Sequence, residues 1–67
     1  MINVTINGDP HRLDSDLNLN ELLRKFDIEE DNVAVEHNRE IVPKSTFDRV
    51  IVTDGDNLEI VHFIGGG

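Results

Sequence analysis

The stretch Leu17-Asn18-Leu19-Asn20-Glu21-Leu22-Leu23-Arg24-Lys25-Phe26 decides how the rest of the chain can pack. Asn18 is a good N-cap, and Glu21 three residues later completes an approximate capping box, with Asn in place of Ser or Thr. Leu17 and Leu22 occupy the two positions of a hydrophobic staple. One helical face is apolar at positions i, i+3, i+4 and i+7, which are Leu19, Leu22, Leu23 and Phe26. The stretch therefore predicts a short amphipathic helix that ends near Asp27, with Ile28 folding back as an apolar cap.

Strand patterns lie on both sides of this helix. Residues Ile2 to Asn7 alternate between apolar and polar, which predicts a half-buried strand. Asn7-Gly8 is a hairpin turn signal, and a second strand at about His11 to Asp14 should pair back with Leu13 inward. After the helix we expect an acidic loop (Glu29–Asn32), a strand (Val33–His37), a two-residue turn (Asn38-Arg39) and a short strand (Glu40–Val42). There follow a helical turn anchored by Phe47 (Ser45–Asp48), an extended run (Val50–Val52), a turn (Asp54–Asn57) and a final strand (Leu58–Ile64).

One short helix cannot cover both faces of a sheet. The order of elements therefore predicts an α+β domain: a mixed sheet of about four to five strands, with the helix packed across one face and the first and last strands adjacent at the centre. In the last strand Leu58 and Ile60 fit the inward face, and Val61 and Phe63 point outward. Exposed apolar side chains can mark an interface, so we expect Val61, Phe63 and Ile64 to form a docking patch for a protein partner.

Composition limits the possible functions. The 67 residues predict one domain over residues 1–64 and a flexible glycine tail over residues 65–67, and the absence of cysteine excludes disulfides, thiolate zinc sites and catalytic thiols. The net charge of −8 argues against nucleic acid and anionic membrane surfaces and favours a basic face on a partner. No apolar run has the length of a transmembrane helix, and the first residues do not resemble a signal peptide, so a cytoplasmic location is expected.

The final residues, Gly65-Gly66-Gly67, offer no side chain. Such a tail can thread into a narrow channel, and its reactive group is the carboxylate of Gly67, which can be activated as an acyl adenylate. A frayed terminus or a cloning remnant is the alternative interpretation, and the tail alone does not decide between them.

No catalytic site or metal site is expected within the chain itself. The three histidines, His11, His37 and His62, fall on different predicted strands, whereas a metal site needs its ligands to converge. The acidic residues form no pair that resembles a catalytic dyad, and Ser15 and Ser45 have no neighbouring base.

Taken together, these segments resemble the ubiquitin-like β-grasp sulfur carriers, and most closely those of thiamine biosynthesis, the ThiS family. The resemblance covers nearly the whole chain and rests on Ile2–Gly8, Leu17–Ile28, Val33–Glu36, Glu40–Pro43, Gly55–Val61 and the ending His62-Phe63-Ile64-Gly65-Gly66-Gly67. Two turns depart from the family pattern. Asn38-Arg39 stands where Asn-Gly is common, and Asp27 stands where the family often has glycine at the helix end.

The resemblance implies a carrier rather than an enzyme. An adenylating enzyme of the ThiF type would use ATP and Mg²⁺ to activate Gly67, and a cysteine desulfurase would supply sulfur for a C-terminal thiocarboxylate. That group would donate its sulfur to thiazole synthase (ThiG), with Gly65 and Gly66 as spacer. The chain itself would bind no cofactor.

Three alternatives stay open. The small subunit of molybdopterin synthase uses the same terminal chemistry in the same superfamily, although the short segment between Ile28 and Leu58 favours the thiamine carrier. A ubiquitin-like modifier conjugated to lysines would also use the tail. In a plain β-grasp interaction module the glycine end would be inert.

Overall fold

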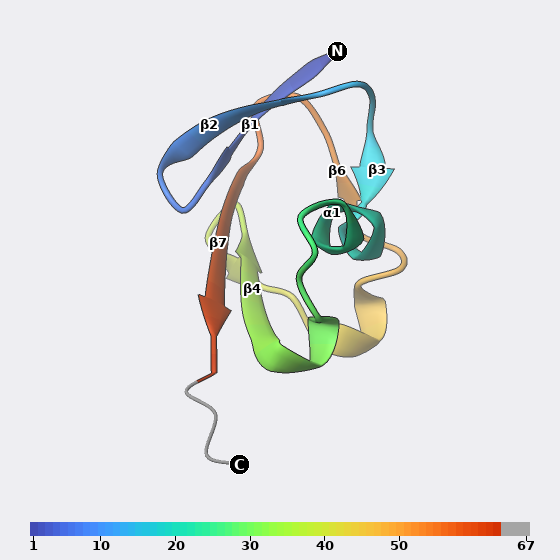
Figure 1. Ribbon diagram of the computed structural model, residues 1–67, viewed down its shortest axis with the longest axis vertical. Coiled ribbons are helices and arrows are strands. Elements are labelled where there is room, and N and C mark those ends of the chain that lie inside the picture. The colour runs from blue at the N-terminus through green and yellow to red at the C-terminus, as the bar shows by residue number, and fades with distance from the viewer. Residues whose placement is uncertain (64–67) are drawn as a thin grey trace.

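A five-stranded mixed sheet, in the order β2-β1-β7-β4-β5, is the framework of the molecule (Figure 1). Its strands are β1 (Ile2–Ile6), β2 (Asp9–Leu13), β4 (Val33–His37), β5 (Glu40–Ile41) and β7 (Asn57–His62). In this computed structural model residues 1–63 are described. The pair β1 and β7 is parallel and the other pairs are antiparallel. The predicted adjacency of the first and last strands is therefore confirmed, and β7 lies at the centre of the sheet.

The helix α1 (Leu19–Lys25) begins and ends as its sequence predicts. The backbone N–H of Glu21 donates to Oδ1 of Asn18 at 2.8 Å, and the Asn18 N–H donates to Oε1 of Glu21 at 2.9 Å. At the other end Asp27 adopts a positive φ of 58°, and the N–H of Ile28 donates to the carbonyl of Leu23 at 2.8 Å. This arrangement is a Schellman motif, in which Asp27 holds the position that usually favours glycine.

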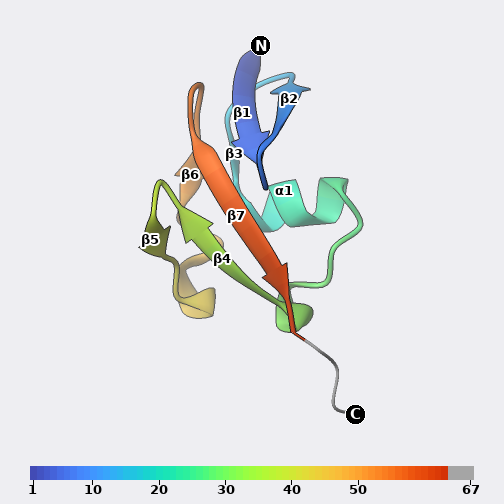
Figure 2. The ribbon, with the colours of Figure 1, turned by 90° about the vertical axis from the view of Figure 1, so that its left-hand side faces the viewer.

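A single cluster of buried apolar side chains fills the space between α1 and the sheet. It consists of Ile2, Val4, Leu13, Leu19, Leu22, Leu23, Val33, Val35, Val42, Phe47, Val52, Leu58 and Ile60. Figure 2 shows β7 and β4 in front and α1 behind them, so the helix covers one face of the sheet only. The predicted anchor Phe47 follows a 3₁₀ turn (Lys44–Thr46) and is almost completely buried.

Several boundaries differ from the sequence prediction. A separate two-stranded sheet joins β3 (Leu17–Asn18) to β6 (Ile51–Val52), and β3 was not predicted because two residues are too short to show alternation. Strand β2 begins at Asp9 and includes Pro10, which an edge strand tolerates because one side of it needs no ladder partner.

The helical turn before Phe47 also differs from its prediction. It begins at Lys44, one residue before the predicted start, and no side-chain hydrogen bond caps it. Instead the Thr46 hydroxyl donates to the carbonyl of Pro43 at 2.8 Å.

Candidate functional site

The outward end of β7 carries the residues that the sequence marks for docking. Leu58 and Ile60 are buried beneath α1, as predicted, and the alternate residue Val61 is exposed on the other face. Val61 and Phe63 expose 61% and 57% of their surface. The N–H of Phe63 donates to the carbonyl of Asn32 at 2.9 Å, which ties the residue after β7 to the residue before β4. Val61 therefore lies within β7, and the backbone of Phe63 is fixed directly after the strand.

The remaining predicted site residues, Ile64, Gly65, Gly66 and Gly67, lie outside the described residues. Strand β7 runs toward the end of the molecule opposite the N-terminus, so Val61 and Phe63 lie at that end (Figures 1 and 2).

The outer sheet face contains further residues that the sequence interpretation missed. Ala34 lies directly opposite Val61 across the β4–β7 pair, and it is exposed. In the next row Glu36 lies between Ile41 on β5 and Glu59 on β7. Ile41 is 78% exposed. The alternation of residues 33–37 could have predicted the exposure of Ala34 and Glu36, because it places both on the face that α1 leaves uncovered.

Glu36 and Glu59 give this outer face an uncompensated negative charge. The ion pairs formed among residues 1–63 include neither carboxylate. Like charges directly opposite each other in a sheet destabilise it. A surface of this kind favours a partner that presents apolar groups together with a basic side chain.

The histidines do not converge. The ring of His11 packs edge-on against Phe26 with ring centroids 5.1 Å apart, and His62 is exposed. His37 is half-buried, and its Nε2 lies 2.7 Å from Oδ2 of Asp56. Among residues 1–63 no group of three or more His, Asp or Glu side chains could hold a metal ion.

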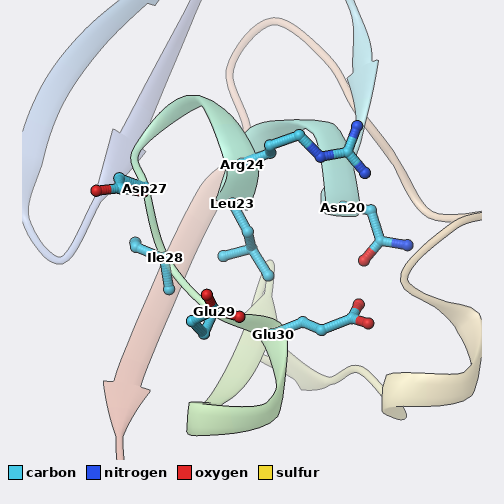
Figure 3. A pocket seen from close by; sticks show the side chains of 7 residues that line it. All are labelled: Asn20, Leu23, Arg24, Asp27, Ile28, Glu29 and Glu30. Carbon is cyan, nitrogen blue, oxygen red and sulfur yellow. The ribbon is translucent and has the colours of Figure 1, made fainter.

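A pocket of about 320 Å³ lies at the C-terminal end of α1 (Figure 3). Its lining residues come from α1 and the loop after it: Asn20, Leu23, Arg24, Asp27, Ile28, Glu29 and Glu30. Arg24 and Asp27 point away from each other in this view, and the acids come from an exposed loop. The pocket therefore brings together no acid and base positioned for proton transfer. Within the described part of the chain no helix is long and apolar enough to cross a membrane.

Comparison with known proteins gives one consistent family. The model of the ThiS family matches residues 4–67. A sulfur carrier protein ThiS of Bacillus subtilis is 43% identical over 49 residues, which cover 73% of this chain and 74% of that protein. A thiazole synthase of Paramagnetospirillum magneticum is 47% identical over 64 residues, covering 96% of this chain. The chain spans only 20% of the length of that thiazole synthase and of a second one, from Magnetococcus marinus.

The fold agrees with the same family. The crystal structure of a thiamine biosynthesis protein (ThiS) from Geobacter metallireducens superposes with a TM-score of 0.87 at 39% identity, covering 98% of this chain and 100% of that one. The predicted ubiquitin-like β-grasp architecture is thereby confirmed. Because the family match extends over nearly the whole sequence, the chain belongs to the ThiS family.

Proposed function

We propose that this chain is a sulfur carrier of thiamine biosynthesis, with Gly67 as the residue that carries the sulfur. The main support is the ThiS family match, which runs from residue 4 to residue 67 and so includes the glycine segment. The Bacillus relative that bears the name of sulfur carrier is similar over three quarters of its length. The chain has no cysteine, so the transferred sulfur has to be held by the main chain rather than by a side chain.

The proposed chemistry has three steps. An adenylating enzyme of the ThiF type uses ATP and Mg²⁺ to join AMP to the Gly67 carboxylate, releasing pyrophosphate. The terminal sulfur of a cysteine-desulfurase persulfide then attacks the carbonyl carbon, and AMP leaves with the former carboxylate oxygen. A thiol cleaves the resulting S–S bond and leaves the thiocarboxylate. Adenylation matters because it turns a poor leaving group into a good one.

Thiazole synthase is the proposed recipient of the sulfur. Support comes from the two thiazole synthases that contain a segment similar to this chain. A segment carried within the same polypeptide acts beside its partner at high effective concentration. We propose that Val61, Phe63 and Ile64 form the surface through which this chain docks to its partners, the ThiF-type enzyme and thiazole synthase.

Intact-protein mass spectrometry tests the carrier role. The full chain is incubated with a ThiF-type enzyme, ATP, Mg²⁺, a cysteine desulfurase, cysteine and a thiol. The proposal predicts a mass gain equal to the exchange of one oxygen for sulfur, located at Gly67 by fragmentation. Omitting ATP should abolish the gain. An unchanged mass, with an enzyme shown to modify its own carrier, would contradict the proposal.

A further inference from the structure

The parallel ladder between β1 and β7 stops before β7 does. Its last pair is Ile6 with Leu58, after which the N–H of Asn7 donates to the carbonyl of Leu58 at 2.9 Å. The chain then turns away, with φ of 50° at Asn7 and 84° at Gly8. The rest of β7, from Glu59 to His62, has no further backbone partner on this edge among residues 1–63. This is the half of the strand that carries Val61.

The side chain of Asn7 occupies the place that the next β1 residue would have filled. Its Oδ1 accepts from the N–H of Ile60 at 2.7 Å, and its Nδ2 donates to the carbonyl of Ile60 at 3.0 Å. One carboxamide thus satisfies both backbone groups of Ile60, as a neighbouring strand would. Both bonds are partly buried, so water competes with them less than at an open strand edge.

Asparagine meets two separate requirements at this position. The positive φ favours Gly, Asn or Asp over other residues. Of these three only asparagine provides both a donor and an acceptor in its side chain. Aspartate would accept from the Ile60 N–H but would place a carboxylate against the Ile60 carbonyl, and glycine would leave both backbone groups without a partner.

From this geometry we propose that Asn7 is a positioning residue for the outward end of β7. By holding Ile60 from the β1 side, Asn7 fixes the direction in which the strand presents Val61 and Phe63 to a partner. The expected effect of Asn7 on adenylation rests on the proposed function, since it requires the activating enzyme to bind this end of β7. The hydrogen-bonding role of Asn7 can be tested without any partner.

A second asparagine supplies a matched control. Asn38 also lies in a turn with a positive φ, of 51°, and its Oδ1 accepts from the N–H of Asn57 at 2.9 Å. Asn38 therefore holds the beginning of β7, whereas Asn7 holds its middle. The variants Asn7→Gly and Asn38→Gly keep their turns feasible and add similar chain flexibility. Each removes one acceptor of a β7 amide and one side-chain donor, which Asn7 gives to the Ile60 carbonyl and Asn38 gives to Oδ1 of Asp56 at 3.2 Å.

Hydrogen exchange followed by NMR is the first measurement. In Asn7→Gly the Ile60 amide should exchange about tenfold faster relative to the Val4 amide, because it loses its acceptor. In Asn38→Gly the Asn57 amide should accelerate instead, with the Ile60 amide unchanged. Unchanged Ile60 exchange in Asn7→Gly would overturn the proposal.

Steady-state adenylation by a ThiF-type enzyme is the second measurement, made well below the melting temperature of every variant. Asn7→Gly should raise the KM for the carrier by about tenfold with kcat unchanged, because only a fraction of the molecules presents the strand correctly. Asn7→Asp should give a smaller rise, since it keeps one of the two bonds, and Asn38→Gly should leave the KM unchanged.

The outcomes separate the two proposals. An equal rise in KM for Asn7→Gly and Asn38→Gly would mean that general destabilisation is the cause, and would overturn the positioning role. If the enzyme does not adenylate the wild-type chain, the proposed function fails, and the exchange rates still decide whether Asn7 holds Ile60.

Discussion

The Nε2 atom of His37 lies 2.7 Å from Oδ2 of Asp56, which joins the end of β4 to the turn before β7. The same carboxylate accepts from the N–H of Thr53 at 2.9 Å and from Nδ2 of Asn38 at 3.2 Å. Burial raises the pKa of Asp56, but the hydrogen bonds from His37, Thr53 and Asn38 and the charge of His37 outweigh it and hold the pKa below its ordinary value of 3.8. The ionised carboxylate is therefore the form that the folded state prefers.

This preference predicts how stability depends on pH. Because the pKa of Asp56 is lower in the folded chain than in the unfolded one, its contribution is present above pH 3.8 and is lost as the pH falls through the folded-state pKa. Asp56→Asn should lower the free energy of unfolding at pH 7 by about 1–2 kcal/mol. Urea denaturation at pH 7 and at pH 2.5 measures the effect, and the difference from wild type should shrink at the lower pH. Asp14→Asn, at an exposed position, is the control, and a loss that stays constant with pH would contradict the assignment.

The turn between β4 and β5 contains a backbone conformation that its sequence does not suit. Arg39 has a φ of 73°, in the left-handed region that disfavours residues with a Cβ atom. Arg39→Gly should raise the free energy of unfolding by about 1 kcal/mol, since the relief of strain exceeds the added entropy of the unfolded chain. Arg39→Ala removes the same side chain without relieving the backbone, so it should give no gain. Equal stabilisation by both substitutions in urea denaturation would show that the arginine side chain, and not its φ, is unfavourable.

The elements with short-range signals could be predicted from the sequence. The α1 boundaries follow from Asn18 and Glu21 at one end and from Asp27 and Ile28 at the other, all of which interact within a few residues. The first strand and residues 33–37 were equally clear, because alternation over five residues fixes both the strand and its buried face. The exposure of Val61 and Phe63 followed from the same rule.

The features that depend on long-range pairing could not be predicted. The opposition of Glu36 and Glu59 follows from the register between β4 and β7, which the two segments do not specify on their own. Asn7 and Ile60 lie 53 positions apart in the sequence. The hairpin turn already explains an asparagine before Gly8, so nothing near Asn7 indicates its contact with Ile60. In the second sheet β6 lies within the extended run predicted at Val50–Val52, whereas the two-residue strand β3 and its pairing with β6 were not predicted.

The opposed carboxylates of Glu36 and Glu59 give a third prediction. Glu59→Gln should raise the free energy of unfolding by about 0.2–1 kcal/mol at low salt, because it removes a cross-strand repulsion. Glu36→Gln should give a similar gain, and the double variant should gain little more than either single one, since both remove the same interaction. Urea denaturation at low ionic strength and at about 1 M salt, where exposed charges are screened, measures both effects. Fully additive gains would show that the two carboxylates act independently.

The exposed end of β7 gives the prediction that bears most directly on function. Val61→Ser combined with Phe63→Ser should weaken binding to a ThiF-type enzyme by at least about tenfold, because two apolar side chains would no longer be buried in the complex. The free energy of unfolding should change by no more than about 0.5 kcal/mol, as both side chains are exposed in the free chain. Isothermal titration calorimetry measures the affinity, and urea denaturation the stability.

A third exposed apolar residue makes this prediction specific. Ile51 is 50% exposed but belongs to the second sheet, with β3, and not to the face formed by β4 and β7. Ile51→Ser should therefore leave the affinity unchanged, although it removes a comparable apolar side chain from the surface. If Ile51→Ser weakens binding as much as the β7 variant does, the partner contacts the second sheet as well, and Val61 and Phe63 do not define the docking surface. If neither variant changes the affinity, recognition depends on residues other than these exposed apolar side chains.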